Sequence, residues 1–141
     1  MDSNYIISAT KAQQFPEQDL PEFTFVGKSN CGKSSLLNAL FQRKNLARTS
    51  STPGRTQMIN FFSLKLSLEK SFVFADLPGY GFSKTARSVK ASWNKLISTY
   101  LETRKISKLL FLFDARRNIE DYEIAYPVSY THLTLPTTPY V

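Results

Sequence analysis

The amino-acid sequence predicts an α/β fold, in which helices cover an open, mostly parallel sheet and the ligand-binding loops lie at one edge. Three observations lead to this fold class. An apolar run ends at Gly27 and is followed by a glycine-containing loop and a helical pattern. Two further apolar runs are separated by the polar pair Glu69 and Lys70, as in a hairpin. A second helical pattern then leads into residues 109–113, which are apolar on both faces.

The first half of the chain predicts a strand, a helix and a long loop. Residues 23–26 are aromatic or β-branched and predict a strand. Residues 33–41 predict a helix, whose apolar face carries Leu36, Leu37, Leu40 and Phe41. Residues 42–57 have no periodicity and are rich in Ser, Thr, Pro and Gly. A loop of this length inside a compact domain is usually functional or disordered.

The second half predicts a hairpin, a helix and a buried strand. Apolar residues alternate with polar ones over 62–68, so we expect this first hairpin strand to be half exposed and antiparallel at the sheet edge. Its partner, 72–75, ends at Asp76. After the loop at 77–87, a helix has one apolar stripe, made of Val89, Trp93, Leu96, Ile97, Tyr100 and Leu101. Residues 109–113 predict a parallel strand with a helix on each face.

Composition limits the possible classes of protein. A length of 141 residues suits a single domain. No segment approaches the roughly 18 apolar residues of a membrane span, and the start lacks the pattern of a secretory signal. A single cysteine builds no disulfide framework, which suits a reducing cytoplasm. The net charge of +7, dispersed through the middle of the chain, fits a solvated surface or a polyanion-facing one.

The strongest motif lies between the first strand and the first helix. Residues 27–34 match G-x-x-x-x-G-K-[ST], which predicts a P-loop NTPase. Its backbone N–H groups and the helix N-terminus can surround a phosphate. Lys33 would neutralise phosphate oxygens, and the Ser34 hydroxyl would bind Mg²⁺. The candidate nucleotide-binding residues of this segment are Gly27, Lys28, Ser29, Asn30, Cys31, Gly32, Lys33, Ser34 and Ser35.

A second candidate segment follows the hairpin. Asp76, Leu77, Pro78 and Gly79 match D-x-x-G at the end of a predicted strand. An aspartate there can hold a Mg²⁺-bound water, and Gly79 can offer its N–H to a γ-phosphate. The same letters also form a common turn after strands, but the distance from the P-loop favours the functional interpretation.

Thr56 is the third candidate. A threonine in the loop after the P-loop helix can complete the Mg²⁺ shell when a γ-phosphate is present. Thr49, Ser50 and Thr52 lie in the same loop and compete for this role.

Taken together, residues 27–40, 52–57 and 76–81 resemble the EngB family of bacterial ribosome-assembly GTPases, over roughly 15–126. The resemblance implies a Ras-like G domain that binds GTP or GDP, with Ser34 and Thr56 as Mg²⁺ ligands and Asp76 acting through water. It implies catalytic roles for Lys33 and Thr56. It also adds nucleotide contacts from Asp76 to Gly79 and from Gly54, Arg55, Thr56, Gln57 and Met58. The family assists large-subunit assembly, through ribosomal RNA or protein, with a link to cell division and septation; no DNA partner is expected.

Two departures from related GTPases shape the expected activity. The guanine-reading motif [NT]-K-x-D is absent from the chain, so guanine preference comes from the resemblance. Tyr80 stands where Ras-like proteins carry a water-orienting glutamine, so we expect slow hydrolysis unless a ribosomal partner or a cation assists.

Asn30 resembles a position that helps bind K⁺ in related GTPases, and equal turnover in Na⁺ and K⁺ would contradict that role.

The segment 127–141 differs from the rest of the chain. Residues 128–137 carry no charge and match, at all ten positions, the translation of a transposase sequencing adaptor. We therefore expect 1–126 to be the N-terminal part of one EngB-type G domain, incomplete at its C-terminus, and 127–141 to be foreign. The alternative is a natural Thr/Pro-rich tail. Reading the source DNA beyond the Tyr126 codon, without a transposase adaptor, distinguishes the two.

Two other functions remain open on the residues alone. A P-loop ATPase or small-molecule kinase would use the same phosphate site with an adenine pocket. A non-enzymatic RNA-binding module would use the basic surface and bind RNA regardless of the nucleotide.

Overall fold

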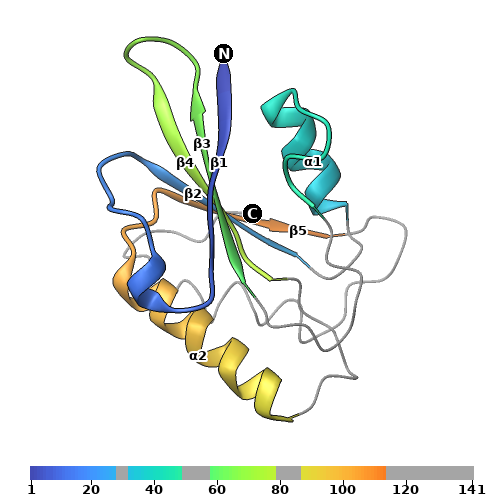
Figure 1. Cartoon of the computed structure of the whole chain (residues 1–141), viewed down its shortest axis with the longest axis vertical. Helices are drawn as coiled ribbons and strands as arrows, with labels where there is room; N and C mark the ends of the chain where they lie inside the picture. The colour runs from blue at the N-terminus through green and yellow to red at the C-terminus, as the bar shows by residue number, and fades with distance from the viewer. Residues whose placement is uncertain (28–31, 49–57, 79–86, 114–141) are drawn as a thin grey trace.

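The computed structural model describes residues 1–27, 32–48, 58–78 and 87–113, without the side chains of 87–94. Its elements in chain order are β1 (Asp2–Ala9), η1 (Ala12–Gln14), β2 (Glu22–Gly27), α1 (Lys33–Phe41), β3 (Ile59–Lys65), β4 (Ser71–Asp76), α2 (Arg87–Thr103) and β5 (Lys108–Leu112). The helices α1 and α2 lie on opposite sides of one sheet (Figure 1). Neither is long and apolar enough to cross a membrane. The segment 127–141, predicted to be foreign, lies outside the described residues.

The five strands form one mixed sheet in the order β1-β3-β4-β2-β5. β2 pairs in parallel with β4 on one side and with β5 on the other. β3 is antiparallel to both β1 and β4, so it is the one reversed strand among those described. The predicted α/β class and the predicted strands at 23–26, 72–75 and 109–113 are confirmed.

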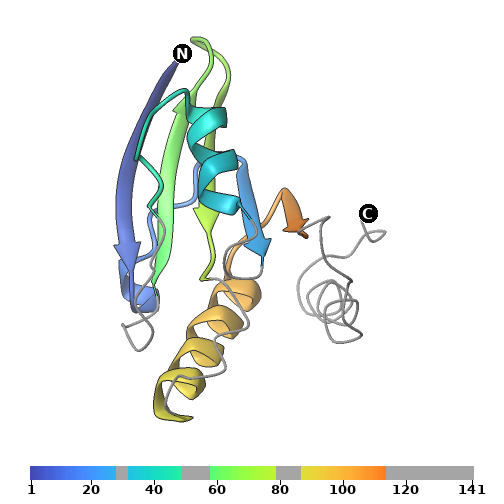
Figure 2. The same cartoon turned by 90° about the vertical axis from the view of Figure 1, so that its right-hand side faces the viewer.

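The expected position of the reversed strand at the sheet edge is wrong. β1 pairs along the outer side of β3, from Asp2 opposite Lys65 to Ala9 opposite Ile59. Figure 2 shows β1 at one edge and β5 at the other. β1 escaped prediction because its polar start gives no strand signal, and backbone hydrogen bonds to β3 hold it. The alternating pattern also stops early, because Leu68 lies in the hairpin turn with 92% of its surface exposed.

The core consists of two clusters, one on each face of the sheet. Alternate residues of each central strand point to opposite faces, as the pleat requires. The face covered by α1 holds an aromatic cluster, made of Phe25, Phe41, Phe62 and Phe74 with Leu37, Ala47 and Leu64. The face covered by α2 holds a mainly aliphatic cluster, which includes Val26, Ile59, Phe61, Ala75, Ile97, Tyr100 and Leu101.

Two expectations about burial need correction. α1 buries Leu37 and Phe41, whereas Leu36 and Leu40 are exposed, so its apolar stripe is narrower than predicted. Only residues four apart on this short helix face the sheet. The strand at 109–113 was expected to be covered on both faces, yet Leu110 is 40% exposed. β5 has β2 on one side and is an edge strand in the described part of the chain.

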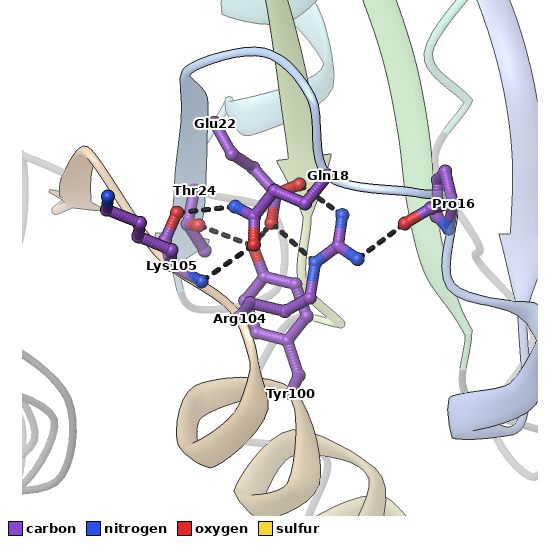
Figure 3. A network of polar contacts seen from close by, with 7 residues as sticks. All are labelled: Pro16, Gln18, Glu22, Thr24, Tyr100, Arg104 and Lys105. Atoms are coloured by element: carbon purple, nitrogen blue, oxygen red, sulfur yellow. Dashed lines mark hydrogen bonds and ion pairs between the residues drawn. The ribbon is translucent and has the colours of Figure 1, made fainter.

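A buried polar network joins the start of β2 to the end of α2 (Figure 3). Glu22 is fully buried, and its carboxylate accepts hydrogen bonds from Arg104 Nη2 at 2.6 Å and Nε at 3.2 Å. The Tyr100 hydroxyl donates to the same carboxylate at 2.6 Å. Since that proton is used, the Thr24 hydroxyl, 2.6 Å away, donates to the Tyr100 oxygen. Arg104 also donates to the Pro16 carbonyl, which ties the segment before β2 to α2.

This environment makes the stability of the fold depend on pH. Burial, and then the adjacent Glu22 carboxylate, raise the pKa of Tyr100 well above 10.0. In the unfolded chain the phenol ionises near its ordinary value. The stabilisation is therefore fully present below about pH 10 and is lost as the pH rises above it.

The Tyr100→Phe variant tests this network. We expect its free energy of unfolding to fall by about 1–3 kcal/mol near pH 8, because two buried groups lose a partner. Above about pH 10 the parent should lose stability more steeply than the variant. Urea unfolding between about pH 8 and pH 11 measures both effects. Tyr5→Phe, at an exposed tyrosine, is the matched control and should change stability by less than about 0.5 kcal/mol. If the free energy of unfolding falls equally with pH in the parent and in Tyr100→Phe, the buried Tyr100 phenol is not the source of the pH dependence.

Candidate functional site

The parallel pairing of β2 with β4 brings two predicted site segments to one edge of the sheet. Phe25 lies opposite Asp76, and the Leu77 N–H extends the pairing with a 3.0 Å hydrogen bond to the Phe25 carbonyl. After β2 the chain turns to α1 on one face, and after β4 it reaches α2 on the other. Neighbouring parallel strands whose connections leave to opposite faces form the usual ligand-binding crevice of an open α/β sheet.

Gly32 makes the entry into α1 possible. It is the N-cap residue, with a φ of 91°, in the left-handed region that favours glycine. Its carbonyl accepts the first helical hydrogen bond, from the Leu36 N–H at 3.0 Å. Among the residues that the structure describes, no side chain caps this end of the helix. The first N–H groups of an α-helix have no partner within the helix, and its dipole favours negative charge there, so the start of α1 suits an anion.

Lys33 and Asp76 form an ion pair at this edge. The Lys33 ammonium contacts Asp76 Oδ1 and also donates to the Leu77 carbonyl. The two side chains are 12% and 6% exposed. Apart from Lys33, no donor in the described part of the chain offers Oδ1 a hydrogen bond. The sequence predicted a phosphate role for Lys33 and a magnesium role for Asp76, and the fold brings these two side chains into contact.

The donor set fits a magnesium ion that is shared with phosphates. Asp76 Oδ1 is a buried carboxylate oxygen with unused acceptor capacity. Mg²⁺ prefers oxygen ligands and commonly takes one or two carboxylates, several waters and phosphate oxygens. No group of three or more His, Cys, Asp and Glu that could hold a metal occurs within the described ranges.

A pocket of about 420 Å³ lies beside the first turn of α1. Its volume is within the usual range of small-molecule sites. Its wall includes two predicted residues, Ser34 and Ser35, and four that sequence reasoning missed, namely Asn38, Asn45, Ala47 and Arg48. Arg48 belongs to no motif and adds only to the dispersed positive charge of the chain. Its position in the pocket depends on how the loop after α1 folds back.

The other predicted site residues divide into those the structure describes and those it does not. Gly27 is buried at the end of β2, and Leu77 and Pro78 are buried directly after β4. Met58 is 40% exposed and directly precedes β3. The remaining residues lie outside the described ranges, and their roles stay predictions: Lys28, Ser29, Asn30, Cys31, Gly54, Arg55, Thr56, Gln57 and Gly79.

Curated relatives of this chain are called probable GTP-binding protein EngB. The protein from Syntrophotalea carbinolica is 45% identical over 99% of this chain and 66% of its own length. The one from Syntrophus aciditrophicus is 48% identical over 86% of this chain and 60% of its own length. A relative from Clostridium perfringens is 49% identical over 81% of this chain and 56% of its own length. The chain thus spans less than two thirds of the length of these relatives.

Solved structures share the fold. The G domain of the FeoB iron transporter from T. maritima has a TM-score of 0.52 at 18% identity, over 81% of this chain and 66% of that one. A variant of Aquifex aeolicus Era bound to GDP and AlF₄⁻ also has a TM-score of 0.52, at 24% identity, over 77% of this chain and 35% of that one. At these identities the likeness concerns the fold alone, which is that of a P-loop G domain.

The family model described as 50S ribosome-binding GTPase matches residues 22–133, which include β2, α1 and β4 with the candidate site between them. The chain therefore belongs to the 50S ribosome-binding GTPase family, and its similarity within that family is to the EngB GTP-binding proteins.

Proposed function

We propose that this chain carries the phosphate and magnesium site of a GTPase switch that hydrolyses GTP to GDP and phosphate. The contact between Lys33 and Asp76, beside the start of α1, carries the proposal. A magnesium–nucleotide complex needs a cation for phosphate oxygens and a carboxylate for the metal or its water, and here the two adjoin. The names of the family and the relatives support guanine as the base.

The residues of the chain would act by binding and orientation. The first N–H groups of α1, behind Gly32, would hold phosphate oxygens. Lys33 would lie against the β- and γ-phosphates and offset charge that develops as water attacks the γ-phosphorus. Ser34 and Thr56 would be direct ligands of Mg²⁺, with Asp76 acting through a water. When bound, Mg²⁺ neutralises charge on the phosphate oxygens.

The proposed partner is the large ribosomal subunit, whose assembly in the cytoplasm the switch would assist. The family description names a 50S ribosome-binding GTPase, and a net charge of +7 suits a partner rich in phosphates. The loops that carry Thr56 and Gly79 would change their order with the γ-phosphate and thereby gate binding. A K⁺ ion near Asn30 and a link to cell division belong to the same proposal, on the strength of the EngB resemblance.

Replacing Lys33 tests the nucleotide site. Lys33→Ala should weaken GTP and GDP binding by about 100-fold or more, because a charge-assisted contact to the phosphates is lost. Calorimetric titration measures the affinities, and circular dichroism checks the fold, since Asp76 loses its partner. Lys65→Ala, at an exposed lysine of β3, is the matched control and should bind as the parent does. Unchanged binding in a folded Lys33→Ala variant would refute the proposal, and equal competition by ATP would favour an ATPase or kinase.

Replacing Asp76 tests the magnesium role separately. Asp76→Asn keeps the shape of the side chain and removes its charge. The gain in GDP affinity on adding Mg²⁺ should shrink by about 10- to 100-fold, as expected for a residue that holds a metal through water. Titrations with GDP in EDTA and in Mg²⁺ give this ratio for the parent, the variant and the exposed-site control Asp2→Asn. A variant with the magnesium dependence of the parent would rule out this role for Asp76.

Binding to ribosomal subunits tests the partner. The protein should sediment with isolated large subunits, and more of it with a non-hydrolysable GTP analogue than with GDP, because the loops order around the γ-phosphate. Binding should weaken as salt rises, as phosphate contacts require. Small subunits serve as the control. Sedimentation that is equal with both nucleotides would instead favour an RNA-binding module that is indifferent to GTP.

A further inference from the structure

Asn38 holds the loop that follows α1. Its side-chain Nδ2 donates to the Ala47 carbonyl at 2.8 Å, and its Oδ1 accepts from the Ala47 N–H at 2.7 Å. Both backbone groups of Ala47 are thus bound by one amide, nine positions earlier in the chain. The backbone donor and acceptor also determine which way round the amide lies. Two bonds to one residue fix its orientation as well as its position.

Other contacts hold the loop between these two residues. Gln42 and Asn45 have φ values of 52° and 61°, a left-handed conformation that non-glycine residues adopt when the surroundings require it. The Arg43 guanidinium donates to the Ser3 carbonyl of β1 at 3.1 Å. Ala47 is 2% exposed and packs in the aromatic cluster between α1 and the sheet. Three sets of contacts therefore hold the chain between α1 and Ala47. They are the amide of Asn38, the Ser3 carbonyl of β1 and the aromatic cluster.

Arg48 follows this fixed point and lines the pocket beside α1, together with Ser34 and Ser35. The two serines belong to the first turn of α1, where N–H groups and the helix dipole favour an anion. A guanidinium presents five donors in a planar arrangement that matches phosphate oxygens. Lys33 points elsewhere, to Asp76 and Leu77. The pocket thus combines a second cation with the start of the helix.

We propose that Arg48 binds the phosphate chain of the nucleotide and that Asn38 is the positioning residue that holds Arg48 at the pocket. The inference rests on the proposed nucleotide site and adds two residues to it.

The test compares GDP and inorganic pyrophosphate affinities of the parent, Arg48→Ala, Arg48→Lys, Asn38→Ala and the double variant. Arg48→Ala should weaken binding of both ligands by about tenfold. Arg48→Lys should weaken it by less, because an ammonium keeps the positive charge but lacks the planar set of donors that can form two parallel hydrogen bonds to a phosphate. Asn38→Ala should weaken binding to a similar degree. Lys44→Ala removes one positive charge from the same loop, outside the lining of the pocket, and should stay within about twofold of the parent.

The double variant separates positioning from mere support of the fold. If Asn38 acts through Arg48, the double variant should bind no more weakly than the weaker single variant. Fully additive losses would overturn the positioning role of Asn38. Parent-like affinities in a folded Arg48→Ala variant, with binding still lost in Lys33→Ala, would overturn this inference and leave the proposed function standing. If the parent binds neither ligand, both fail.

Discussion

The rest of the structure depends on the parallel pairing of β2 with β4. The register that sets Phe25 opposite Asp76 puts the loop into α1 and the carboxylate of β4 at the same edge. A slip of one residue would turn every side chain of one strand to the other face. It would separate Lys33 from Asp76 and mix the two core clusters. The hydrophobic cores on both faces therefore hold the register on which the site depends.

The site and the buried polar network lie at opposite ends of β2. Glu22 begins the strand and is bound by Arg104 and Tyr100, whereas Gly27 ends it beside the P-loop. Five steps along a strand amount to roughly 17 Å. The end with the network is held by charge-assisted hydrogen bonds from Arg104 to the fully buried Glu22 carboxylate. The other end is left for loops, as is usual for binding sites on a rigid sheet.

In this molecule the fold and the site residues support different conclusions. The G domains of FeoB and Era share the fold at 18% and 24% identity, so the fold by itself identifies a scaffold that serves many proteins. The chemistry lies in a few positions at one edge. There, the N-cap glycine with its positive φ, the Lys33 ammonium and the start of α1 lie at the edge of the sheet where the Asp76 carboxylate ends β4. The proposed magnesium–phosphate site is built from these features.

The sequence alone determined the strand–loop–helix unit around the P-loop and the roles expected of Lys33 and Asp76, because periodicity and motif spacing are local signals. Tertiary structure decided what depends on distant segments. β1 lies at the edge because backbone groups of β3 pair with it, and no side-chain pattern shows that in advance. Glu22 and Arg104 meet across 82 positions, and Arg48 reaches the pocket because the loop folds back on α1. Such contacts follow from packing of the whole sheet, which no window of sequence contains.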